Sequence, residues 1–297
     1  MIWVIGAKGM LGQEICRQLE ENKIEFTGTD IELDFTDEAS CASFAQNKSI
    51  SYIINCAAYT AVDKAESDQE LAAKLNIKGP EVIARLAKKI GATLIHISTD
   101  YVFDGTGSSP YTEETPVKPI GVYGVTKADG EKAVRENCDK YYILRTAWLY
   151  GWKGKNFVYT IIRAINTHDS IKVVNDQRGT PTFACDLAAI ILSIIEQNKN
   201  ASVPYGTYHC TDLGEITWYD FALSIKTLGE KYGYVTNKTC TVNPCSTEEY
   251  PTPAKRPAYS VLDKTKIQKA LNKSLPDWEQ SLEAFISSPL FDEERIK

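Results

Sequence analysis

Two residues suited to proton transfer, Tyr123 and Lys127, are spaced four apart within Tyr-Gly-Val-Thr-Lys. Residues at this spacing lie on the same face of a helix. A phenol with its ordinary pKa of about 10 gives up a proton slowly at neutral pH, and a nearby ammonium lowers that pKa by stabilising the phenolate. The pair also occurs by chance on exposed helices, so it predicts a general acid only together with other signals.

A second signal is a pair of hydroxyl residues, Ser98 and Thr99, at the end of an apolar strand pattern. A hydroxyl at that position can hydrogen-bond a substrate carbonyl and polarise it. We expect Thr99 to face the site, and Ser98 is the competing choice. The absence of a His suitably placed near a Ser or Cys nucleophile argues against a hydrolase.

A third signal is a glycine-rich loop between the first strand pattern and the first helical pattern. Glycines at this place permit a tight turn, close approach of a pyrophosphate and close packing of helix on strand. The helix N-terminus adds free N–H groups for phosphates. The Gly-x-x-Gly-x-x-Gly spacing is typical of short-chain dehydrogenases/reductases. We expect a dinucleotide to bind here, at Gly6, Gly9, Met10, Leu11 and Gly12.

Further cofactor contacts are predicted where other strands end, because open parallel sheets bind ligands at that edge. Asp30 ends the second strand and would bind the ribose hydroxyls, which favours NADH over NADPH because a carboxylate repels a 2′-phosphate. Asp34 and Phe35 would flank the adenine. The remaining predicted contacts follow the third strand and would line the ribose and diphosphate: Ala57, Ala58, Tyr59 and Thr60.

The elements that must position these residues alternate between strands and helices through the first half of the chain. Such alternation predicts an α/β fold with a Rossmann-type, doubly wound parallel sheet. After about residue 150 the alternation breaks down and prolines become frequent. We therefore expect a dinucleotide-binding domain over 1–150, to which residues of about 168–200 return, and a smaller C-terminal α/β substrate domain over 151–297.

Composition excludes several classes of protein. The net charge is −6 over 297 residues, so a general binder of nucleic acid or anionic membrane is not expected. No apolar run reaches the roughly 20 residues of a membrane span. The first residues enter a strand pattern without a secretory leader, and the eight cysteines show no two-residue gap of a thiol pair or zinc site, so we expect a cytoplasmic protein with free thiols.

Together these motifs resemble the extended short-chain dehydrogenase/reductase superfamily and, within it, the dTDP-4-dehydrorhamnose reductases. The glycine loop and the Tyr/Lys pair define only the superfamily. Segments typical of the narrower family extend over nearly the whole chain: residues 55–66, Ser-Thr-Asp-Tyr-Val-Phe-Asp-Gly at 98–105, 145–151, 175–182 and Tyr-Pro-Thr-Pro-Ala-Lys-Arg-Pro at 250–257.

The resemblance implies NAD(P)H-dependent reduction of the 4-keto group of dTDP-4-dehydro-L-rhamnose to dTDP-L-rhamnose, a precursor of cell-surface polysaccharide. It makes Thr99, Tyr123 and Lys127 the catalytic set, with Tyr123 and Lys127 also contacting the cofactor. Residues implied to bind the nucleotide sugar are Val62, Thr99, Asp100, Tyr101, Trp148 and, through the diphosphate, Arg256 with its neighbour Lys255.

Three questions stay open at this level. The family uses NADPH or NADH. Some members of the family hold Mg²⁺ between subunits through carboxylates, one of which lies at the position of Glu14. At another ligand position this chain has Cys185, and a thiol is a poor ligand for Mg²⁺. We therefore expect no metal bridge. The oligomeric state is also open, since the sequence is compatible with a monomer and with a homodimer. The alternatives to the reductase are a nucleotide-sugar epimerase or dehydratase of the same superfamily and a non-catalytic regulatory homologue.

Overall fold

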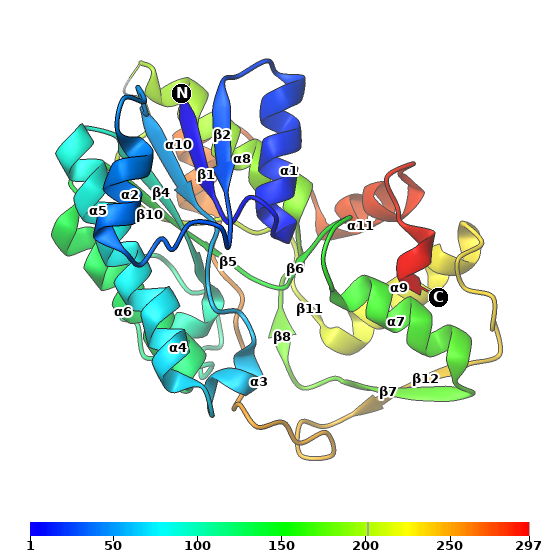
Figure 1. Cartoon of the computed structure of the whole chain (residues 1–297). Helices are drawn as coiled ribbons and strands as arrows, with labels where there is room; N and C mark the ends of the chain where they lie inside the picture. The colour runs from blue at the N-terminus through cyan, green and yellow to red at the C-terminus, as the bar shows by residue number, and fades with distance from the viewer. Residues whose placement is uncertain (201, 297) are drawn as a thin grey trace.

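A six-stranded parallel sheet forms the centre of the computed structural model, which describes residues 1–200 and 202–296 (Figure 1). Its strands are short and buried, as expected when helices cover both faces. In spatial order they are β10 (Gly206–His209), β5 (Tyr141–Thr146), β4 (Thr93–Thr99), β3 (Tyr52–Asn55), β1 (Ile2–Ile5) and β2 (Phe26–Thr29). The chain moves from β1 outward to β2 and then returns to β3 on the other side, so the topology reverses between β1 and β3. That crevice is where doubly wound sheets bind their ligands.

Helices pack on both faces of this sheet. The face covered by α1 (Met10–Glu21) also receives α8 (Ala184–Asn198) and α10 (Thr265–Leu271), and their aliphatic side chains form one continuous core. The opposite face is covered by α2 (Glu38–Ala45), α5 (Gly79–Ile90) and α6 (Val122–Asn137). The predicted Rossmann-type architecture is therefore confirmed.

The helical segment between β3 and β4 is divided in the structure. It comprises α4 (Gln69–Ala73), a π-helical turn (Lys74–Lys78) and α5. Pro80 at the start of α5 has no N–H to continue an α-helical ladder, which explains a wider turn at this point. The turn also brings the Asn76 carbonyl against Gly130 of α6, where a Cβ would lie only 2.0 Å from that oxygen.

A C-terminal unit, defined here as α7 (Phe157–Thr167), α9 (Trp218–Lys231), α11 (Trp278–Ser287) and the parallel pair β7 (Ser170–Val174) and β12 (Thr241–Cys245), lies beside the sheet (Figure 1). Its core is rich in aromatic rings, among them Tyr150, Phe221 and Phe285. Of residues 168–200, α8 packs against α1, whereas β7 belongs to the C-terminal unit.

The remaining short elements connect these parts. They are α3 (Val62–Ala65), two 3₁₀ turns (Asp100–Val102 and Glu293–Ile296), and the two-residue pairs β6 (Leu149–Tyr150) with β9 (Thr182–Phe183) and β8 (Arg178–Gly179) with β11 (Ile216–Thr217). All eight cysteines in this structure are free thiols. Within residues 1–200 and 202–296, no helix has the length and hydrophobicity that crossing a membrane requires.

Candidate functional site

A cavity of about 930 Å³ opens at the carboxyl ends of the central strands. It runs from the glycine loop after β1 to the first residues after β5. The predicted site residues that line it are Gly6, Gly9, Met10, Leu11, Gly12, Asp30, Asp34, Phe35, Ala57, Ala58, Thr60, Val62, Thr99, Asp100, Tyr101, Tyr123, Lys127 and Trp148. Three predicted residues, Tyr59, Lys255 and Arg256, lie outside this lining. All the predicted residues in this lining come from the first half of the chain, between Gly6 and Trp148.

The glycine loop is shaped for a phosphate-bearing ligand. Gly6 has a φ of +77°, and a Cβ there would lie 2.8 Å from the Ala57 nitrogen, so only glycine lets this loop meet the loop after β3. A Cβ on Gly12 would lie 2.0 Å from the Gly6 carbonyl oxygen, so α1 begins directly against the loop. This cradle and the free N–H groups at the start of α1 fit the diphosphate of a dinucleotide.

Asp30 is held against the glycine loop. One of its carboxylate oxygens accepts from the Lys8 backbone N–H at 2.8 Å, and the other accepts from the Ile31 N–H. Glu32 accepts from the Asp30 N–H and pairs with the Lys8 ammonium at 3.0 Å. Two carboxylates therefore stand at the end of β2, and the adjacent lysine is already neutralised by one of them.

Two other residues predicted to contact the cofactor, Asp34 and Tyr59, differ in their hydrogen-bond partners. Asp34 accepts from Thr36 and pairs with Lys74 at 3.1 Å, and these bonds, led by that from Thr36, hold the pKa of its carboxyl below the usual range. Tyr59 was expected to line the cofactor, but its N–H donates to the Asn76 side chain and its hydroxyl to Asp68. Tyr59 therefore holds the loop after β3 in place through these hydrogen bonds.

Tyr123 and Lys127 share one face of α6 and both line the cavity, as their spacing predicted. Burial raises the pKa of Tyr123 above its usual range, while the Thr99 hydroxyl acts in the lowering direction. Burial also lowers the pKa of Lys127 to about 8. The Lys127 ammonium donates to the Ile97 carbonyl at 2.6 Å and does not lower the pKa of Tyr123 here. The expected direction of that shift was wrong, because the loss of hydration raises the pKa of the phenol and the nearby Asp100 carboxylate acts in the same direction.

Thr99 and Ser98 point to different partners. The Thr99 hydroxyl donates to the Asp100 carboxylate at 3.0 Å at the cavity wall. Ser98 is 3% exposed, and its hydroxyl donates to Glu131 at 2.6 Å. Because Ser98 is bound to Glu131, Thr99 is the better placed of the two to meet a ligand.

Sequence reasoning missed the ion pair below these residues. Glu131, on α6, receives two hydrogen bonds from Arg145 of β5, at 2.8 and 2.7 Å, and both side chains are buried. The pKa of Glu131, which burial alone would raise, is lowered overall by Arg145. Arg145 follows the apolar run Tyr-Tyr-Ile-Leu near the end of β5, and a charged residue next to such a buried run was the signal available.

The sugar-binding residues predicted by resemblance form the far end of the cavity. Asp100 is 2% exposed, one of its carboxylate oxygens has no hydrogen-bond partner in the described chain, and burial raises its pKa to about 6. Trp148 adopts a left-handed backbone with φ +47° and stacks on Trp218 with ring centroids 3.6 Å apart. An unpaired acceptor and an indole in the lining of one cavity suit a sugar that is polar on one side and apolar on the other.

Arg256 is the exception among these residues. Its guanidinium donates to Asp63 at 2.8 Å and to the Tyr101 hydroxyl at 3.2 Å. These bonds tie the segment 252–257 to α3, and Arg256 does not reach the cavity lining. Its expected contact with a diphosphate stays a prediction.

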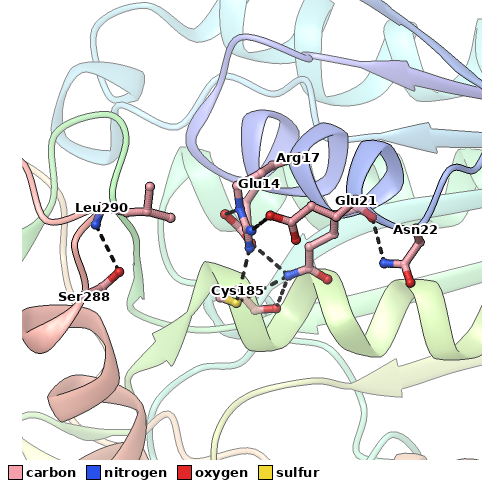
Figure 2. Close-up of polar contacts among 8 residues, drawn as sticks. Glu14, Arg17, Glu21, Asn22, Cys185, Ser288 and Leu290 are labelled. Atoms are coloured by element: carbon pink, nitrogen blue, oxygen red, sulfur yellow. Dashed lines mark hydrogen bonds and ion pairs between the residues drawn. The ribbon is translucent and has the colours of Figure 1, made fainter.

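The position considered for Mg²⁺ is shown in Figure 2. Both Glu14 carboxylate oxygens accept from the Arg17 guanidinium, and one also accepts from Gln18 at 2.8 Å. Across from them lies the Cys185 thiol, and Leu290 lines the same small pocket. A paired carboxylate, a thiol and an aliphatic side chain do not fit a hard divalent cation. Within residues 1–200 and 202–296, no group of three or more candidate metal ligands occurs.

Comparison with known proteins places the chain. The family model described as the RmlD substrate binding domain matches residues 1–290. The dTDP-4-dehydrorhamnose reductase of Salmonella typhimurium is 38% identical over 295 residues, covering 96% of this chain and 97% of the relative. That of Escherichia coli K12 is 39% identical, with the same coverage of 96% and 97%.

Solved structures similar to this chain are also dTDP-4-dehydrorhamnose reductases. A dTDP-4-dehydrorhamnose reductase from Clostridium acetobutylicum superimposes with a TM-score of 0.88 at 45% identity, covering 96% of this chain and 98% of that one. One from Bacillus anthracis, in complex with NADP, gives 0.88 at 37% identity, covering 96% and 97%. The relatives and solved structures named above are dTDP-4-dehydrorhamnose reductases. The chain itself belongs to the family described as the RmlD substrate binding domain.

Proposed function

We propose that this chain reduces the 4-keto group of dTDP-4-dehydro-L-rhamnose to dTDP-L-rhamnose with NADPH or NADH. The observation that carries the proposal is the joint placement of Thr99, Tyr123 and Lys127 along one cavity that begins at the glycine loop. The family membership and the names of the relatives support the substrate.

The bound nicotinamide supplies a hydride to carbon-4 of the sugar. Tyr123 stays protonated at neutral pH because burial raises its pKa, so the phenol donates a hydrogen bond to the ketone oxygen and then its proton to the oxyanion that develops there. Thr99 hydrogen-bonds the same oxygen and polarises the carbonyl. Lys127, one helical turn along, supplies positive charge near the resulting phenolate and a donor for the nicotinamide ribose.

The substrate half of the cavity holds the deoxysugar. The unpaired oxygen of Asp100 accepts from a sugar hydroxyl, and Trp148 covers the apolar face of the ring. The free thiols support a reducing compartment, the cytoplasm. The product would feed cell-surface polysaccharide synthesis.

The test is a spectrophotometric assay with dTDP-4-dehydro-L-rhamnose, comparing NADPH with NADH. One cofactor consumed per sugar reduced supports a reductase, whereas an epimerase or dehydratase, which regenerates its cofactor, would show no net consumption. A non-catalytic homologue would turn over neither cofactor.

The role of Tyr123 is tested by Tyr123→Phe, which should lower kcat roughly 100-fold, the typical contribution of a positioned general acid. Tyr205→Phe is the control, because this exposed ring lies outside the cavity. Near-normal kcat in Tyr123→Phe at saturating substrate and cofactor would remove the phenol from the mechanism.

A further inference from the structure

Four lysine side chains line the cavity, and they differ in how their charges are used. Three are engaged within the protein: Lys8 with Glu32, Lys74 with Asp34, and Lys127 with the Ile97 carbonyl. The fourth, Lys155, is exposed to the cavity and makes no hydrogen bond or ion pair with any residue in 1–200 or 202–296. It is therefore the lysine of this lining that has no partner among the described residues.

Lys155 lies on the segment between β6 and α7, which runs beside the start of α1 (Figure 1). A Cβ on Gly154 would lie 3.5 Å from the Met10 Cβ and Cε atoms, and one on Gly151 would lie 3.2 Å from its Cγ. Met10 is the first residue of α1. The C-terminal side of the molecule thus places Lys155 close to the helix terminus that ends the glycine loop.

This segment is held in place by its own hydrogen bonds. The Asn156 amide donates to the Gly151 carbonyl at 2.7 Å, and its side-chain oxygen caps α7 by accepting from the Tyr159 N–H. Arg295 donates to the Gly154 carbonyl at 3.1 Å. Fixed backbone on both sides of Lys155 lowers the entropy that its side chain loses on binding a ligand.

The cavity also needs such a cation. Asp30, Asp34 and Asp100 contribute carboxylates to the lining, whereas a dinucleotide brings two negative charges on its diphosphate. Backbone N–H groups of the glycine loop and the start of α1 can bind one side of that diphosphate. The segment that carries Lys155 packs against Met10 at the start of α1, which puts Lys155 within the same part of the cavity.

We propose that Lys155 binds the diphosphate of the dinucleotide cofactor from the side opposite the glycine loop, so that the cofactor joins α1 to the segment between β6 and α7. This inference rests on the proposed function, since it assumes a dinucleotide at the glycine loop. Diphosphate chemistry is shared by the nucleotide of the sugar substrate, but the packing of Gly154 on Met10 assigns Lys155 to the cofactor.

The experiment measures binding without turnover, by calorimetry with ADP-ribose and with dTDP. Lys155→Ala should raise the Kd for ADP-ribose about ten-fold, as for loss of one charge-assisted contact, and leave the Kd for dTDP within two-fold. Lys155→Arg keeps the charge and should restore most of the affinity. The matched control is Lys153→Ala, two residues earlier on the same segment, whose side chain lines the separate small pocket with Glu14.

Each other outcome contradicts the proposal. An unchanged Kd for ADP-ribose in Lys155→Ala would show that the lysine does not contact the cofactor, and weakened dTDP binding alone would assign it to the substrate. An equal loss of ADP-ribose affinity in Lys153→Ala would indicate a general effect of positive charge on this segment. If the wild-type chain bound neither ADP-ribose nor NADPH, the proposed function itself would fail. That result differs from one in which the wild-type chain binds both and Lys155→Ala binds ADP-ribose equally well, which would contradict only the role of Lys155.

Discussion

Arg145 and Glu131 join the end of β5 to the middle of α6 through two buried hydrogen bonds, at 2.8 and 2.7 Å. Ser98 donates to the same carboxylate, so strand β4 is attached to it as well. Thr99 follows Ser98, and Lys127 precedes Glu131 by one helical turn. The ion pair therefore fixes, relative to each other, the strand and the helix that carry the proposed catalytic residues.

Breaking this pair should cost more stability than any surface substitution nearby. Glu131→Gln leaves the Arg145 guanidinium buried without its counter-charge, and such losses amount to about 3 to 5 kcal/mol. Urea unfolding followed by circular dichroism measures the change. Arg135→Ala is the matched control, because Arg135 bonds the same carboxylate at 3.1 Å from a partly exposed position and should cost under about 1 kcal/mol. Equal unfolding midpoints for the two variants would refute a special role for the buried pair.

The pH dependence of kcat/KM should reveal the titration of Lys127. Burial lowers its pKa to about 8, so its positive charge is present below that pH and is lost as the pH rises through about 8. Activity should then fall on the alkaline side, with a midpoint near pH 8. Lys127→Arg keeps a guanidinium charged throughout this range, so whatever activity remains should lose the alkaline limb. A limb that persists in this variant would have to come from another group.

Cofactor preference should respond to the acids at the end of β2. Asp30→Asn keeps an acceptor for the Lys8 N–H but removes a charge that repels a 2′-phosphate. Glu32→Gln weakens the ion pair that neutralises the Lys8 ammonium. Both variants should raise the ratio of kcat/KM for NADPH to that for NADH, by about ten-fold for Asp30→Asn. The check is steady-state kinetics with the two cofactors, and an unchanged ratio would place the 2′ position away from these residues.

Much of the cofactor half could be predicted because its signals are local. The glycine loop is indicated by its glycine spacing, the strand before it by a continuous apolar run, and the shared face of Tyr123 and Lys127 by their spacing of four residues. Such segments fold as the pattern dictates because the residues that decide them are neighbours in sequence. The edge strand β10, with the mixed sequence Gly-Thr-Tyr-His, carries no such pattern and forms only because β5 offers it a partner.

Long-range partners could not be predicted. Arg256 pairs with Asp63, which is 193 residues away, and nothing in the sequence near either residue indicates this pairing. The direction of the Tyr123 pKa shift was wrong for a similar reason. Local spacing identifies the nearby ammonium, whereas the extent of burial depends on the whole fold.

Gly179 provides a way to test Trp148 without changing the indole itself. A Cβ on Gly179 would lie 2.5 Å from the Trp148 Cε2 atom, and Trp218 is stacked on the same indole at 3.6 Å between centroids. Gly179→Ala must therefore displace the indole, which cannot remain at its place against Trp218. We expect the KM for the sugar nucleotide to rise about ten-fold while the Kd for NADPH stays within two-fold, since the cofactor lies at the other end of the cavity. Thermal unfolding checks that the variant is folded. A KM that does not change would show that the sugar does not depend on the position of Trp148, and a parallel loss of NADPH binding would show that the substitution disturbs more than the substrate half.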